Sequence, residues 1–148
     1  PGADRYSDQH REAPMQGDVM AEVCRFLAER AAHAERAGVS RACIALDPGL
    51  GFGKTVSQNF ELVARLPELL RLGYPVVVGA SRKSFVGAVT DVKEPADRVA
   101  GSIGVALAAV ARGAHVVRVH DVAAHAQALA AWGASERGGA EQKSSGMP

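Results

Sequence analysis

Cysteine and aromatic residues are scarce in this sequence of 148 residues, and it has no long apolar run. Its two cysteines, Cys24 and Cys43, cannot build a disulfide framework, so we expect both to be buried as small apolar residues in a protein of the reducing cytoplasm. No run approaches the roughly 20 apolar residues that a bilayer span needs. No basic and then apolar leader is present either. We therefore expect neither a membrane span nor a signal peptide.

An excess of charge of one sign is also missing. The net charge is +1 and the isoelectric point is near 8.4, so no strong field favours nucleic acid or an anionic membrane. The composition is 47% hydrophobic, 22% charged and 5% aromatic, which is ordinary for a globular protein. This length and composition predict one compact domain with its own core.

Stretches with helical periodicity alternate with short apolar runs along the chain. The helical stretches are residues 18–37, 57–72, 95–112 and 121–132, and the apolar runs are 41–46, 75–79 and 115–120. Apolar strands that alternate with amphipathic helices predict an α/β fold with a parallel sheet. Ser57 is the expected cap of the second helix, and Pro67 is expected to break it. Residues 1–17 are predicted to be a loop and residues 133–148 a disordered tail.

Polar residues follow each of the three predicted strands. Asp47 ends the first strand, residues 81–84 (SRKS) follow the second, and Arg118 and His120 end the third. Ligands of parallel α/β proteins bind at the carboxyl ends of the strands, so these residues predict a site. Each one also has a purely structural interpretation, with Asp47 capping a turn, Lys83 solvated in a loop and His120 satisfied in a turn.

Arg118 is harder to explain structurally, because it lies inside an apolar run. A buried arginine is costly without an anionic partner. His120 is two residues further on, so a strand would point both side chains to the same face. We expect the pair to bind an anion, either a phosphate or a carboxylate.

The segment 47–54 (DPGLGFGK) contains three glycines, but its spacing excludes the common nucleotide-binding loops. Pro48 stands where a Walker A loop needs its first glycine, and Lys54 stands where a dinucleotide fingerprint needs its last. The glycines are expected instead to let Phe52 and the backbone approach a flat ligand. An acid, a lysine, a phenylalanine and an anion site together suit a flat, nitrogen-rich heterocycle that carries phosphate.

Four blocks of residues resemble the C-terminal half of the dihydropteroate synthase family. They are DPGLGFGK (47–54), GASRKSF (79–85), Arg98 with Gly101 and Ser102, and GAHVVRVHDV (113–122). The resemblance implies a (β/α)8 TIM-type barrel, of which residues 18–132 would supply about the last three βα units. It also implies the reaction of folate biosynthesis that joins para-aminobenzoate to a dihydropterin-methyl diphosphate and releases diphosphate.

The same resemblance implies a role for each matching residue. Asp47, Lys83 and Gly79 would hold the pterin, and Arg118 and His120 the leaving diphosphate. Phe52, Arg82 and Ser84 would line the para-aminobenzoate side, where sulfonamides compete. Lys83, Arg118 and His120 would be the catalytic residues. The family also implies Mg²⁺ and a homodimer, with the magnesium ligand expected in an N-terminal half that this sequence does not include.

Three strands cannot close an eight-stranded barrel, so we expect this chain to be a fragment that is inactive alone. Two other interpretations stay open. One is a pterin- or folate-binding barrel that transfers a methyl group, although such a protein has no need of a diphosphate site at Arg118 and His120. The other is a non-catalytic fragment that keeps the barrel motifs without their chemistry.

Overall fold

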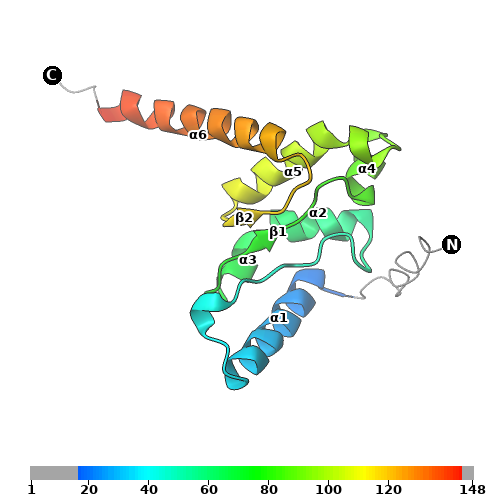
Figure 1. The fold of residues 1–148 in the computed structure, drawn as a ribbon, viewed down its shortest axis with the longest axis vertical. Helices are drawn as coiled ribbons and strands as arrows, with labels where there is room; N and C mark the ends of the chain where they lie inside the picture. The colour runs from blue at the N-terminus through cyan, green and yellow to red at the C-terminus, as the bar shows by residue number, and fades with distance from the viewer. Residues whose placement is uncertain (1–16, 145–148) are drawn as a thin grey trace.

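The structure, a computed structural model, describes residues 17–144 (Figure 1). Its elements in chain order are α1 (Val19–Arg36), a 3₁₀ turn (Arg41–Cys43), α2 (Val56–Ala64), α3 (Leu66–Leu70), β1 (Val77–Val78), α4 (Ser84–Thr90), a second 3₁₀ turn (Pro95–Asp97), α5 (Val99–Ala111), β2 (Val116–Val117) and α6 (Val122–Ser144). Residues 1–16 of the predicted loop 1–17 lie outside the described residues.

The sheet is small and parallel, as the alternation of strands and helices predicts. β1 pairs with β2 in the register Val77 to Val116 and Val78 to Val117. Leu46 adds a single parallel bridge to Val76 on the other side of β1. Its N–H donates to the Pro75 carbonyl over 2.8 Å, and its carbonyl accepts from Val77 N–H over 2.8 Å. Three chain segments therefore run side by side and end at the same edge.

The prediction of a strand at residues 41–46 is wrong except at Leu46, which forms a single bridge. The backbone N–H of Cys43 donates to Ser40 and that of Ile44 donates to Arg41, over 2.8 and 3.1 Å, so the chain closes a 3₁₀ turn here. Groups engaged in such local bonds cannot join a ladder. The turn also leaves Cys43 exposed, so its predicted burial is wrong, while both cysteines are free thiols as expected.

Helices supply most of the core. α2 packs against α1 and α5, α5 packs against α4 and α6, and α3 packs against α1. The Phe60 and Phe85 rings meet edge to face with their centroids 5.3 Å apart. The fully buried side chains of the core include Met20, Leu50, Leu62, Leu66, Leu69, Val76, Val78 and Val86. This core fixes the loops that follow the strands.

The ends of the helices follow the chemistry of the sequence, with one correction. Asp18 caps α1 by accepting a bond from Ala21 N–H over 3.0 Å. α2 begins earlier than predicted, because Thr55 and Gln58 form a capping box, so Ser57 is not the cap. The break predicted at Pro67 is confirmed: α2 ends at Ala64, and the proline lies in the first turn of α3.

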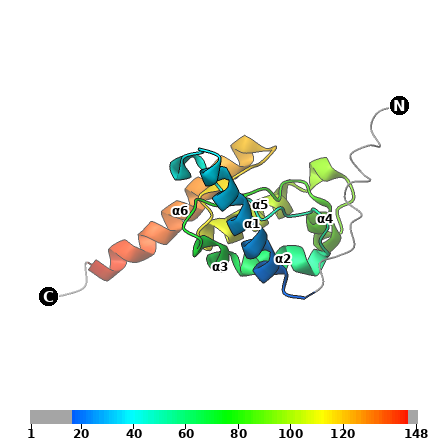
Figure 2. The ribbon, with the colours of Figure 1, turned by 90° about the horizontal axis from the view of Figure 1, so that it is seen from below.

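α6 continues past Trp132, the predicted end of the last helix, as far as Ser144. Residues 133–144 are therefore helical rather than irregular, and residues 145–148 of the predicted tail lie outside the described residues. Alanine, glutamate, glutamine and lysine favour a helix in this segment, while its three glycines weaken it. Figures 1 and 2 show its C-terminal half extending away from the other helices. No helix within residues 17–144 is long and apolar enough to cross a membrane.

Candidate functional site

The loop 47–54 is closed by its own side chains. Its glycines Gly49, Gly51 and Gly53 have φ values of 67°, 83° and 58°, a region that other residues rarely adopt. Asp47 Oδ1 accepts a bond from Gly49 N–H over 2.8 Å. The Lys54 ammonium donates to the carbonyls of Gly49 and Phe52 over 2.8 and 3.0 Å. The turn-capping interpretation of Asp47 is thus correct for Oδ1, which leaves Oδ2 for other partners.

Asn59 is a residue of this site that the sequence pattern did not reveal. It lies on α2, is 1% exposed, and accepts a bond from Gly51 N–H over 2.6 Å. Its amide also donates to the Thr55 carbonyl over 2.8 Å. A buried amide without local partners is costly, so an asparagine inside the apolar face of a helix could have been recognised as a loop anchor.

Lys83 crosses the glycine loop rather than extending into solvent. Its ammonium donates to the Leu50 carbonyl and lies 4.4 Å from the centroid of the Phe52 ring. A Cβ at Gly51 would lie 2.9 Å from Lys83 Cδ, so the glycine is needed for this crossing. Burial lowers the pKa of Lys83, and the nearby Asp47 carboxylate offsets part of that change. Lys83 is therefore not a solvated loop lysine.

Arg118 reaches toward Asp47 across Gly79. Its Nη2 lies 4.0 Å from Asp47 Oδ2. A Cβ at Gly79 would lie only 2.6 Å from the same nitrogen, so a bare glycine is required under the guanidinium. The predicted burial of Arg118 is wrong, because its side chain is 62% exposed beside a strand of only two residues. An exposed guanidinium with one distant carboxylate partner has donors to offer an anion.

His120 takes a different neighbour. Its Nδ1 lies 3.0 Å from Ser81 Oγ, and its backbone N–H donates to the same oxygen over 3.1 Å. Ser81 is itself buried, so it fixes the end of β2 against the end of β1. Arg118 and His120 are therefore held separately, the first beside Gly79 and Asp47 and the second on Ser81.

The backbone at Arg82 is left-handed, with φ of 61°, and three side chains hold it. Its N–H donates to Ser102 Oγ over 2.9 Å, and its carbonyl accepts from Arg98 Nη1 over 2.9 Å. Its guanidinium binds the Asp121 carboxylate at 2.6 and 3.0 Å. Asp121 is thus an ion-pair partner for Arg82, and the hydrogen bond to Arg82 holds the pKa of this carboxyl below its usual value. Ser84, two residues after Arg82, is exposed at the start of α4.

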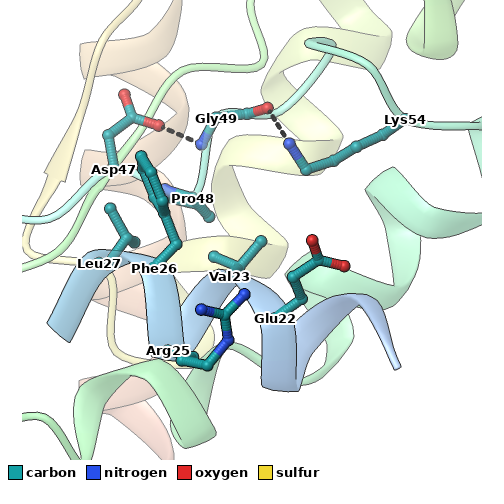
Figure 3. Close-up of a pocket in the computed structure, with 9 residues that line it drawn as sticks. All are labelled: Glu22, Val23, Arg25, Phe26, Leu27, Asp47, Pro48, Gly49 and Lys54. Carbon is teal, nitrogen blue, oxygen red and sulfur yellow. Dashed lines mark hydrogen bonds between the residues drawn. The ribbon is translucent and has the colours of Figure 1, made fainter. Parts of the chain in front are cut away.

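A hollow of about 210 Å³ lies between α1 and the glycine loop. Figure 3 shows Asp47, Pro48, Gly49 and Lys54 on the loop side and Glu22, Val23, Arg25, Phe26 and Leu27 on the α1 side. Asp47 therefore borders both this hollow and the surface where Lys83 and Arg118 lie. Phe26 on the α1 side of the hollow is 54% exposed.

No cluster of three or more histidine, cysteine, aspartate or glutamate side chains within the described part of the chain could hold a metal ion. Mg²⁺ usually keeps several waters and takes one or two carboxylates together with substrate phosphates, so a cluster of this kind is not required for it.

Comparison with known proteins identifies the family of this chain. The sequence model of a family described as pterin binding enzyme matches residues 3–120, which is most of the chain. The chain belongs to the pterin-binding enzyme family. Dihydropteroate synthase of Neisseria meningitidis serogroup C is 52% identical over 120 residues, which cover 80% of this chain and 42% of that protein.

Solved structures agree with this membership of the pterin-binding family. Dihydropteroate synthase from Xanthomonas albilineans with 4-aminobenzoic acid matches at 48% identity and a TM-score of 0.82, covering 85% of this chain and 46% of that one. The same enzyme in complex with 7,8-dihydropteroate matches at 49% identity and a TM-score of 0.82, covering 86% of this chain and 48% of that one. The chain spans less than half the length of the relatives it matches.

Proposed function

We propose that this chain is the C-terminal part of a dihydropteroate synthase, which joins para-aminobenzoate to dihydropterin-methyl diphosphate in folate biosynthesis. One observation carries the proposal: a carboxylate, a lysine and an arginine from three strand ends converge around the glycine loop. Asp47 Oδ2 lies 4.0 Å from Arg118 Nη2, and its charge offsets part of the lowering of the Lys83 pKa that burial causes. The identity with the Neisseria synthase and the likeness to Xanthomonas structures holding 4-aminobenzoic acid and 7,8-dihydropteroate support it.

The chemistry of each group fits one part of the substrates. The Asp47 carboxylate can accept hydrogen bonds from the amino and ring N–H donors of a pterin. The Lys83 ammonium can donate to the pterin oxygen, with Gly79 leaving room beside the ring. The half-exposed Phe52 ring offers an apolar face for para-aminobenzoate, a side on which sulfonamides compete, and Arg82 and Ser84 follow on the adjacent loop.

The proposed reaction breaks the bond between the pterin methylene carbon and the diphosphate oxygen. The leaving diphosphate takes the bonding electron pair, and Arg118 and His120 stabilise its growing negative charge. The amine of para-aminobenzoate then attacks the methylene carbon and loses a proton as the C–N bond forms. Mg²⁺ belongs to the proposed complete enzyme. From the family resemblance alone, its protein ligand is proposed to lie in the part of that enzyme that this chain does not include, and no step here depends on it.

We further propose that the segment supplies the last three βα units of a (β/α)8 barrel. The parallel pairing of β1 with β2 and the bridge at Leu46 support this placement. Three strands cannot close such a barrel, so the chain alone is expected to bind pterin weakly and not to turn over. The free thiols of Cys24 and Cys43 support a reducing cytosolic setting, and the proposed homodimer of the complete enzyme follows from the family resemblance alone.

A methyl-transferring pterin or folate barrel is the second candidate. It would share the pterin-holding acid, but it would not need an exposed guanidinium beside that acid. Arg118, at 62% exposure, therefore favours the synthase. A segment that keeps the motifs without chemistry is the third candidate, and only a measurement of activity separates it from the first.

The test is a chimera in which residues 18–132 replace the corresponding segment of the Neisseria synthase. We expect the chimera to form dihydropteroate and the isolated chain not to. Arg118→Ala should abolish most of the chimera's activity, whereas Arg30→Ala, at an exposed position of α1, should not. A folded but inactive chimera would contradict the proposed function, and turnover by the isolated chain would contradict its expected inactivity alone.

A further inference from the structure

We propose that Lys54 is a positioning residue, which closes the glycine loop and thereby sets the place of the Phe52 ring beneath Lys83. The proposal has two parts, a loop geometry and its effect on the aromatic second substrate. The second part rests on the proposed synthase function, and the first does not.

The Lys54 ammonium joins the two ends of one turn. Gly49 and Phe52 are the first and last residues of that turn, whose backbone bond from Phe52 N–H to the Gly49 carbonyl is 3.3 Å long. Lys54 donates to both carbonyls, over 2.8 Å to Gly49 and 3.0 Å to Phe52. A charged donor makes stronger bonds to carbonyls than a neutral one, so this side chain reinforces a long backbone bond.

Lys54 is also held in a costly position. Burial lowers the pKa of its ammonium, with Asp47 and Glu22 acting in the opposite direction. A lysine without a bonding role would turn its ammonium into solvent, because its long side chain is flexible. Figure 3 shows it instead directed at Gly49, on the wall of the hollow opposite α1.

The loop needs such a closure because its glycines give it other conformations to adopt. Asn59 holds Gly51 N–H and Asp47 holds Gly49 N–H, and both bonds lie before Phe52. Lys54 binds the carbonyl of Phe52 itself. Releasing that carbonyl frees the peptide between Phe52 and Gly53, where φ is already 58°.

The position of Phe52 matters because its ring contacts Lys83 and, under the proposed function, would also contact the second substrate. One face lies 4.4 Å from the Lys83 ammonium, and the side chain remains 48% exposed. If the ring moves, Lys83 loses its cation–π contact and the second substrate loses an aromatic surface. We therefore expect Lys54 to govern the affinity for a flat aromatic amine more than the affinity for the pterin.

The loop geometry is tested by NMR of the isolated chain, which requires no activity. The ring current of Phe52 should shift the Lys83 side-chain ε-CH₂ resonances upfield, and Phe52→Leu should abolish that shift. Lys54→Met should reduce it, Lys54→Arg should largely preserve it, and Lys93→Met, at an exposed lysine, should leave it unchanged. Thermal melts of the same variants confirm that each is folded. A wild-type Lys83 shift in a folded Lys54→Met chain would overturn the proposal.

The substrate effect is tested in the chimera. Lys54→Met should raise KM for para-aminobenzoate about three- to tenfold, the worth of one hydrogen bond, while kcat and the affinity for the pterin stay within about twofold. Lys54→Arg should restore KM. If the Lys83 shift moves but KM does not, the assignment of this loop to the second substrate is overturned and the loop geometry is supported. An inactive wild-type chimera would overturn the proposed function instead, since the NMR result is independent of it.

Discussion

Arg82 and Asp121 form a two-point ion pair that ties the loop after β1 to the end of β2. Arg82 Nη2 lies 2.6 Å from Asp121 Oδ1, and Nε lies 3.0 Å from Oδ2. The pair spans 39 residues of sequence and joins the two segments that carry Lys83 and His120. Bidentate pairing of this kind fixes orientation as well as distance.

Asp121→Asn should lower the melting temperature of the chain and loosen the loop at residues 81–84. The pair is more shielded than the exposed Arg25–Glu29 pair on α1, whose side chains are 65% and 64% exposed. Glu29→Gln should therefore have little effect, because exposed ion pairs contribute little. For each variant, thermal melts measure the melting temperature, and amide hydrogen exchange measures the loosening at residues 81–84. Equal losses in the two variants would contradict the tie between the strand ends.

The stability of the chain should fall in acid partly through Asp18. Its hydrogen bonds to Arg65 and Ala21 lower its pKa from 3.8 to about 2. A depressed carboxyl pKa contributes stability that is present above the unfolded value of 3.8 and is lost as the pH falls toward 2. Asp18→Asn keeps a capping oxygen but removes this titration. Urea midpoints measured from pH 5 to pH 2 should fall less steeply in the variant than in the wild type.

Gly79→Ala should impair substrate binding without destabilising the fold. The new Cβ would meet Arg118 Nη2 at 2.6 Å, and that end of a long side chain can swing away at little cost to stability. In the chimera we expect loss of diphosphate-substrate binding with a nearly unchanged melting temperature. Gly104→Ala on α5 is the matched control, because a methyl group added there would meet nothing within 4 Å among the described residues. That variant should keep binding and gain about 0.5–1 kcal/mol of stability.

Thr55→Ala should destabilise the chain by about 0.5–2 kcal/mol, because it removes the capping box of α2. Ser57→Ala should be nearly neutral, since Ser57 lies within the helix and is exposed. Denaturant unfolding of both variants measures the difference. A larger loss for Ser57→Ala would contradict the observed start of α2.

The sequence predicted much of the order of elements but less of the geometry of the site. The break at Pro67 and the cap at Asp18 are local effects that neighbouring residues alone could predict, whereas the pairing of Asp18 with Arg65 joins positions 47 residues apart. The turn at residues 41–43 could not, because a short apolar run does not reveal that its backbone groups bond within three residues. The pairing of Arg82 with Asp121 depends on two segments meeting in space. Asn59 differs, because its partner Gly51 lies in the loop just before α2, so its burial inside an apolar helix face was a usable signal.

The central claim is that Arg118 receives the diphosphate beside a pterin held by Asp47. Calorimetry of the chimera with dihydropterin-methyl diphosphate and magnesium tests it most directly. Because hydrogen bonds to charged groups contribute about 1.5–3 kcal/mol, Arg118→Ala should weaken binding by roughly 10- to 100-fold, whereas Arg30→Ala should leave it unchanged. Binding that persists unaltered in the Arg118→Ala variant would contradict the account.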